Sequence, residues 1–294
     1  MSPSSVVTAT GPARAWYQPS RGFFWLLRFS CAGEFIGHGA FGILTKKEWL
    51  PYFAVAGIHA HLAYVLMPLI GVLDVTLGIL AILRPMRLTI LYMTCWGLWT
   101  ALLRPLSGES GWETVERAPN YLVPFSLLLV MGLPWSWRSL LQLERSAMIP
   151  SSMPAVAPLP TASLPIMSAS GACALQWCLR SATCGAFVGH GAYGLILRKA
   201  GWTPVFLHLG ITTDTVQADH LVAAAGAVEI VLGLLALAVP GTALLILLAT
   251  CKLSVECIWY PMNGKPWWEV LERTSNYVAP VALLMVMRAR RTHA

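Results

Sequence analysis

The sequence predicts an all-α integral membrane protein made of two tandem four-helix bundles, with about eight transmembrane helices. Of its 294 residues, 56% are apolar and only 11% are charged, whereas soluble domains carry about 25% charged residues. The mean hydropathy is +0.64. Two further observations set the architecture: several apolar stretches approach the roughly 20 residues that a transmembrane helix needs, and polar residues recur in one order in both halves.

The apolar stretches fall into two sets of four, which we interpret as membrane spans. They cover residues 22–44, 62–83, 88–105 and 117–136, and then 173–197, 219–239, 241–260 and 274–289. The chain accordingly divides into a tail (1–21), a first four-helix repeat (22–140), a linker rich in Pro, Ser and Ala (141–172), a second repeat (173–289) and a basic tail (290–294). Two shorter apolar stretches, 48–58 and 202–211, predict short elements that lie over the polar clusters.

The two sets look like copies of one unit. The Gly-His-Gly motif around His38 aligns with that around His190, and Asp74 in "GVLDVTLG" aligns with Glu229 in "GAVEIVLG". The stretch "WETVERAPNYLVP" (112–124) aligns with "WEVLERTSNYVAP" (268–280). Chance similarity of apolar helices would not keep these polar residues in the same order, so the sequence predicts an internal duplication.

Basic residues predict the orientation. One side of the predicted membrane is flanked by Arg14, Arg21, Arg84, Arg87, Arg138, Arg145, Arg288, Arg290 and Arg291, and the other by Lys46, Lys47, Arg198, Lys199 and Lys265. Positive residues favour the cytoplasmic side, so both termini and the linker are expected there, with the protein in a bacterial cytoplasmic membrane. Four spans per copy make the repeat parallel. The net charge of +7 thus indicates a lipid bilayer as partner and no nucleic acid.

Ionisable residues inside the predicted spans are the candidate site, because a charge in a membrane is costly and is seldom kept without a function. In the first repeat they are Glu34, His38, Asp74, Arg104 and Glu116, and in the second His190, Glu229, Lys252, Glu256, Glu272 and Arg273. The structural alternative is that neighbouring charges neutralise each other and lock helices together. Asp74 and Glu229 lie deepest, and we expect them to be buried, near the histidines and inside their own bundles.

The two copies differ around the histidines. Glu34 lies one helical turn from His38, where the second copy has Ala186, and we expect His38 or Arg104 to hold it. Lys252 and Glu256 are also one turn apart and are expected to pair. The hypothesis is therefore that the first copy carries the activity and the second is mainly structural.

These residues resemble the DoxX-like membrane proteins, a broad superfamily of four-helix units that includes the small subunit of thiosulfate:quinone oxidoreductase. The resemblance rests on an opening helix with Arg28 and His38-Gly39, repeated as Arg180 and His190-Gly191, and on a last helix that begins at "ERAPNYLVP" or "ERTSNYVAP". It implies a four-helix fold for each copy and an association with quinone or redox chemistry. A tandem fusion differs from the usual single unit.

Four functions remain open at this point, and the sequence does not decide whether the protein is an enzyme. A quinone-associated redox component would use a histidine to hydrogen-bond the quinone and a carboxylate to relay protons. Its electrons would come from a membrane-complex partner, because the sequence has no CxxC, nucleotide-binding loop or haem-attachment motif. The alternatives are a proton- or cation-coupled transporter, a scaffold or assembly subunit, and a haem- or metal-binding protein in which His38 and His190 would ligate one haem b. No metal ligand set is predicted.

Overall fold

A computed structural model describes residues 17–133, 136–141, 166–198 and 200–291. Within these ranges the chain is helical, apart from turns and one isolated antiparallel bridge between Tyr17 and Met167. That bridge lies just before the first helix of each half. Most of the predicted linker and the outermost residues of both tails fall outside the described residues.

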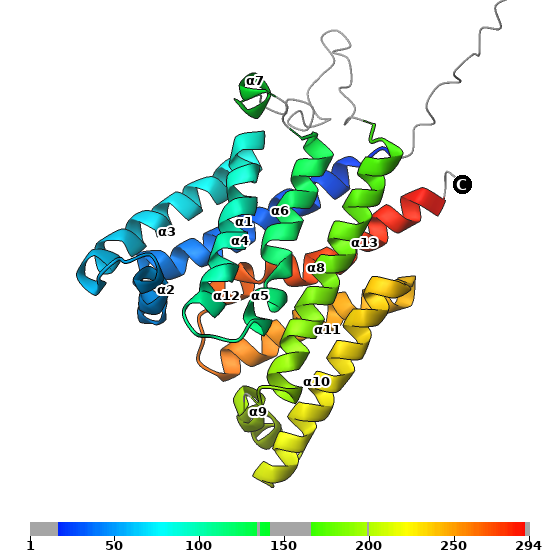
Figure 1. Cartoon of the computed structure of the whole chain (residues 1–294). Helices are drawn as coiled ribbons and strands as arrows, with labels where there is room; N and C mark the ends of the chain where they lie inside the picture. The colour runs from blue at the N-terminus through cyan, green and yellow to red at the C-terminus, as the bar shows by residue number, and fades with distance from the viewer. Residues whose placement is uncertain (1–16, 134–135, 142–165, 199, 292–294) are drawn as a thin grey trace, which may run out of the picture.

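The two halves present their helices in the same order (Figure 1). The first half contains α1 (Arg21–Ile43), a 3₁₀ turn (Lys47–Trp49), α2 (Leu50–Val55), α3 (Ala60–Leu83), α4 (Arg87–Leu106), α5 (Trp112–Glu116), α6 (Ala118–Met131) and the additional α7 (Trp137–Leu141). The second contains α8 (Ala169–Leu195), a 3₁₀ turn (Ala200–Trp202), α9 (Thr203–His208), α10 (Thr215–Ala238), α11 (Thr242–Met262), α12 (Trp268–Glu272) and α13 (Thr274–Arg291). Each predicted span coincides with one of these helices, although α8 and α10 begin four residues before their spans and α6 ends five residues before the end of its span.

Three helices of the described chain are long and apolar enough to cross a membrane. They are α3, α10 and the segment Thr242–Trp259 of α11, while α6 is apolar but shorter. The helices α1, of 23 residues, and α8, of 27 residues, carry the arginines and histidines of the repeated motif. The three apolar helices are compatible with a membrane location, and the full count of eight spans stays a prediction.

Glycines bring the first two long helices of each half into close contact. A Cβ atom added at Gly39 of α1 would lie 2.6 Å from the carbonyl oxygen of Gly71 in α3. In the second half, Gly191 of α8 lies equally close to Gly226 of α10. Small residues allow helix backbones to approach in this way. The repeated glycines after the histidine therefore fix the helix that supplies the acid.

Arginines complete the same two helix pairs. Arg28 is fully buried and donates hydrogen bonds to the carbonyls of Ala81, at 2.9 Å, and Ile82 at the C-terminal end of α3. Arg180 donates to the carbonyl of Leu237 at 3.2 Å, at the end of α10. Each arginine satisfies carbonyls that have no partner within their own helix and complements the negative end of that helix.

The two halves interlock, which differs from the expected pair of separate bundles. Helices α6 and α13 each contact both α1 and α8, while α5 lies against α8 and α12 lies against α1. In Figure 1, α3 and α10 lie at opposite edges of the molecule and α6 runs between them. A second pair of glycines on each histidine helix makes room for the short helix of the opposite half. Gly33 and Gly37 admit the backbone around α12, and Gly185 and Gly189 admit that around α5.

One apolar core joins the halves at the end where α1 and α8 begin. It combines buried residues of both, among them Phe23 and Leu27 of α1, Leu127 of α6, Leu179 of α8 and Leu283 of α13. The polar residues lie further along α1 and α8, toward their C-terminal ends. The core thus anchors the histidine helices at one end and leaves the polar chemistry at the other.

The contact between α8 and α5 predicts that a methyl group added at Gly189 destabilises the protein more than one added at the exposed Gly22. A Cβ at Gly189 would meet backbone atoms of Glu116 closer than 3.0 Å, and backbone cannot move aside cheaply. We expect Gly189→Ala to lower the free energy of unfolding by about 1–3 kcal/mol or more, measured by denaturant unfolding in detergent. Gly22→Ala is the control, because Gly22 is exposed in α1 with only Ser20 Oγ nearby, at 4.0 Å. Equal stability of the two variants would contradict the close contact.

Candidate functional site

Each histidine is held by the acid of its neighbouring helix. His38 Nδ1 lies 2.8 Å from Asp74 Oδ2, and His190 Nδ1 lies 2.6 Å from Glu229 Oε2. Asp74 is fully buried, as expected, whereas the Glu229 side chain is 20% exposed, which corrects the expectation that it is buried. The expected proximity of acid and histidine is confirmed in both halves. A carboxylate at Nδ1 fixes the ring and leaves Nε2 as the nitrogen available to a ligand.

The first cavity, of about 260 Å³, lies beside His38. Its walls are largely aromatic, with Trp49 and Tyr52 from the segment after α1 and Trp96 and Trp99 from α4. The His38 ring stacks on Trp49, with ring centroids 4.5 Å apart and an interplanar angle of 23°. The short element predicted at 48–58 thus covers the histidine, as expected.

Arg104 closes one side of this cavity and does not reach Glu34. Its guanidinium lies 4.5 Å over the Tyr52 ring, and its Nη1 is 3.3 Å from Glu109 Oε2. The Tyr52 hydroxyl donates a hydrogen bond to the same carboxylate. Burial raises the pKa of Tyr52, so the phenol stays protonated as a donor. Arg104, Tyr52 and Glu109 therefore form a latch between α2 and the end of α4.

Glu34 is held by the other half, which corrects the expectation that His38 holds it. The carboxylate is 3% exposed and its Oε2 accepts a hydrogen bond of 2.5 Å from Ser275 Oγ of α13. Ser275 Oγ also lies 3.1 Å from Ser30 Oγ of α1. Glu34, His38 and Glu272 nevertheless line one small void of about 20 Å³. Two elements of the second half thus meet the histidine site of the first.

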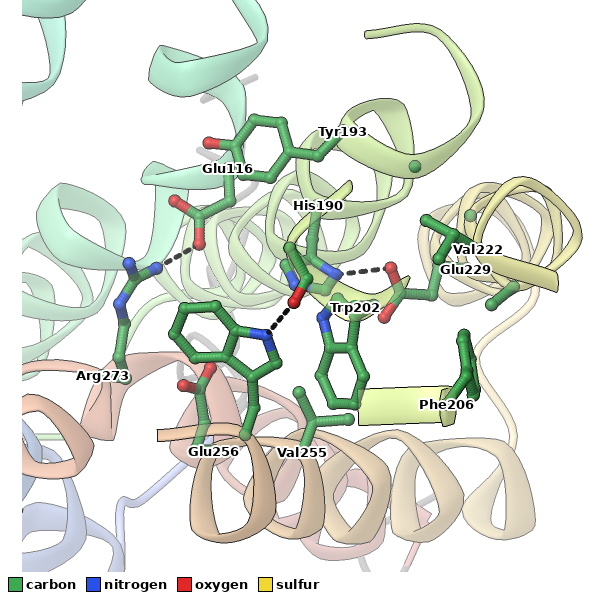
Figure 2. Close-up of a pocket in the computed structure, with 15 residues that line it drawn as sticks. Glu116, His190, Tyr193, Trp202, Phe206, Val222, Glu229, Val255, Glu256 and Arg273 are labelled. Atoms are coloured by element: carbon green, nitrogen blue, oxygen red, sulfur yellow. Dashed lines mark hydrogen bonds and ion pairs between the residues drawn. The ribbon is translucent and has the colours of Figure 1, made fainter. Parts of the chain in front are cut away.

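The second cavity, of about 410 Å³, lies beside His190 and is more polar (Figure 2). Glu116 and Arg273 form an ion pair on one side, and the His190–Glu229 pair lies on the other. Glu116 comes from the first half, so this cavity has walls from both halves, whereas the first cavity is lined by the first half alone. Burial alone would raise the pKa of Glu116, but the nearby Arg273 and Arg117 outweigh it and hold that pKa well below its usual value.

The acidic turns before α6 and α13 are tied to the opposite halves by further contacts. Tyr193 of α8 donates a hydrogen bond of 2.6 Å to Glu113 of α5. Burial raises the pKa of Glu272 in α12, but Lys46 and Arg273 outweigh burial and lower it overall. The Tyr193–Glu113 hydrogen bond and the attraction between Glu272 and Lys46 therefore each hold a short helix against the opposite half.

Lys252 and Glu256 do not form the expected pair. Among the described residues, Lys252 Nζ makes no hydrogen bond or ion pair, and it lies 5.3 Å from the centre of the Phe187 ring. Glu256 lines the second cavity and is 4% exposed. The two side chains leave one helical face in different directions, so the second half is not the neutral, locally paired structure that the sequence suggested.

The described residues contain no group of three or more His, Cys, Asp or Glu side chains arranged to hold a metal ion. His38 and His190 line separate cavities, so they do not face one shared ligand position. A cofactor bound here would meet one histidine at a time.

Comparisons with known proteins leave the site to be interpreted from its own chemistry. The chain matches no protein-family model, no curated protein and no solved structure. The walls of the two cavities differ: the first is aromatic around a single His–carboxylate pair, whereas the second adds Glu116, Arg273 and Glu256. Two related positions in one chain thus offer two kinds of ligand environment.

The buried ion pair between Glu116 and Arg273 should matter far more than the partly exposed one between Arg104 and Glu109. Arg273→Met strands a buried carboxylate, for which we expect a loss of about 3–5 kcal/mol in unfolding free energy. The double variant Glu116→Gln/Arg273→Met should recover much of it. Arg104→Met is the control, because partly exposed pairs contribute about 0–1 kcal/mol. Similar losses for Arg273→Met and Arg104→Met in denaturant unfolding would contradict this assignment.

Proposed function

We propose that the protein is a multi-pass membrane protein of two tandem DoxX-like four-helix units, with both termini cytoplasmic. Its support is the matching order of helices and the matching contacts: His38–Asp74 with His190–Glu229, and Arg28 with Arg180. The three strongly apolar helices supply the membrane association. The excess of arginine on one side supplies the orientation.

The function supported best is binding of a quinone headgroup in the first cavity, as part of a membrane redox system. One observation carries this proposal: His38 borders an aromatic-walled cavity while Asp74 holds its Nδ1. A flat ring can stack among Trp49, Trp96 and Trp99, which is a favourable arrangement for aromatic groups. The volume suits a headgroup, with the isoprenoid tail outside the cavity.

The His38–Asp74 pair also has the proton chemistry that a quinone needs. A neutral imidazole can accept the proton of a quinol hydroxyl at Nε2, and Asp74 then stabilises the imidazolium. In the opposite direction the imidazolium returns that proton to a reduced quinone. The electrons pass to or from a redox partner in the membrane, because the chain itself has no redox-cofactor motif.

A proton- or cation-coupled transporter is the second candidate. The observation that favours it is the set of carboxylates around the second cavity, where the buried Glu116 and Glu256 and the partly exposed Glu229 come from three helices. Buried carboxylates of this kind mark ion pathways in many membrane proteins. Uptake of a labelled cation into proteoliposomes, driven by a proton gradient, would favour transport over quinone binding.

Quinone binding is tested by two measurements on the purified, detergent-solubilised protein. One sample is extracted with organic solvent to identify co-purified quinone, and a second, intact sample is titrated with decylubiquinone. We expect co-purified quinone in the wild type and at least a tenfold loss of decylubiquinone affinity in His38→Ala. His190→Ala, the matched control, should keep the affinity, because His190 lines the other cavity. The proposal fails if decylubiquinone does not bind the wild type, or if both variants lose binding equally at unchanged stability.

The proposed topology places the linker and both termini inside the cell. Single cysteines introduced at residues 155 and 292 of a cysteine-free variant should resist membrane-impermeant maleimide in intact cells and react after the cells are opened. Labelling of either position in intact cells would contradict the arrangement of eight spans.

A further inference from the structure

Glu256 is the one carboxylate lining the second cavity that has no bonded partner within the described chain. Its side chain is 4% exposed, yet it points into the cavity from α11 (Figure 2). The other two carboxylates of the cavity are compensated: Glu116 pairs with Arg273, and Glu229 pairs with His190. A buried carboxylate without a counter-charge is costly. The geometry therefore leaves room for a cation that the chain does not supply.

Lys252 does not provide that counter-charge by contact. It lies one turn before Glu256 on α11, but its ammonium group lies over the Phe187 ring. Lys252 is not among the residues that line the cavity. It is itself 1% exposed, so its charge lowers the electrostatic cost of Glu256 from a distance while the carboxylate stays open to the cavity.

Aromatic rings flank the carboxylate. Trp202 and Phe206, around the start of α9, and Trp259 of α11 line the same cavity. The rings of Trp202 and Trp259 have centroids 6.4 Å apart, and those of Trp202 and Phe206 are 6.2 Å apart. Trp259 is further fixed by a hydrogen bond of 3.2 Å from its Nε1 to the carbonyl of Gly201. Aromatic faces beside a carboxylate are the surroundings that organic ammonium ions prefer.

The first cavity lacks this combination. The position aligned with Glu256 is Thr100, whose hydroxyl donates to the carbonyl of Gly97 at 3.1 Å. The position aligned with Lys252 is Trp96, a wall of the first cavity. The second cavity, at about 410 Å³, also falls within the range of roughly 300–1,000 Å³ usual for small-ligand pockets. Charge and size both separate it from the quinone site.

We propose that the second cavity binds a small organic ammonium ion, with the carboxylate of Glu256 as counter-ion and Trp202 and Trp259 as aromatic walls. The binding is non-covalent and does not depend on quinone binding at His38. Trp202 lies next to the short helix that covers the cavity, so the ligand would join α9 to α11. The ligand class is a primary or quaternary amine with a small alkyl substituent.

The test uses choline and its uncharged isostere 3,3-dimethyl-1-butanol, titrated calorimetrically into the full-length protein in detergent. We expect choline to bind and the isostere to bind at least tenfold more weakly, because only the charge differs. Glu256→Gln should lose choline binding at least tenfold and keep decylubiquinone binding. Thr100→Val, changed at the aligned position of the first cavity, and His38→Ala should both keep choline binding.

A second set of variants distinguishes loss of choline binding from loss of the folded structure. Glu256→Gln leaves the buried Lys252 without the negative charge one turn away on α11. The double variant Lys252→Met/Glu256→Gln removes both charges and should fold while binding no choline. Trp259→Leu should weaken choline more than it weakens 3,3-dimethyl-1-butanol. The proposal is overturned if the wild type binds choline no tighter than the isostere, or if the folded double variant binds choline as the wild type does.

Discussion

The close approach of two short acidic helices to two glycine-lined faces is the constraint on which the rest of the structure depends. Gly37 admits the backbone of Glu272, and Gly189 admits that of Glu116. Any side chain at these glycines would push the halves apart, and at Gly189 it would disturb the Glu116–Arg273 ion pair beside the second cavity. The histidines are thus positioned from two sides, by their own acid helix and by the opposite half.

Much of the helical framework is readable from the sequence, because it depends on local patterns. Apolar stretches predict the long helices, and the alignment of Asp74 with Glu229 beside aligned histidines predicts the His–acid pairs. The exchange between halves is not readable in this way. A repeat shows which residues are equivalent, but it does not show whether α12 meets α1 or α8, since both partners carry the same glycines.

One signal of the exchange was nevertheless present in the sequence. Glu34 is aligned with Ala186 of the second copy, and Ser275 is aligned with Pro119 of the first. The two polar residues occur in different halves, yet they bond to each other in the structure. A polar group that appears in only one copy, together with a second that appears only in the other, predicts a contact between copies. The latch of Arg104, Tyr52 and Glu109 had no such signal, because all three residues lie in the same half.

The interlocked arrangement has a consequence for how such a chain can change over time. Under the proposed duplication, a single ancestral unit would have needed a second copy of itself to place a short acidic helix against its histidine helix, and the resulting homodimer would have carried two identical sites. Every substitution would then have acted twice. Once both units lie on one polypeptide, Thr100 and the position of Glu256 can vary independently, although the second cavity still takes Glu116 from the first half. Covalent fusion thus permits specialisation without giving up mutual dependence.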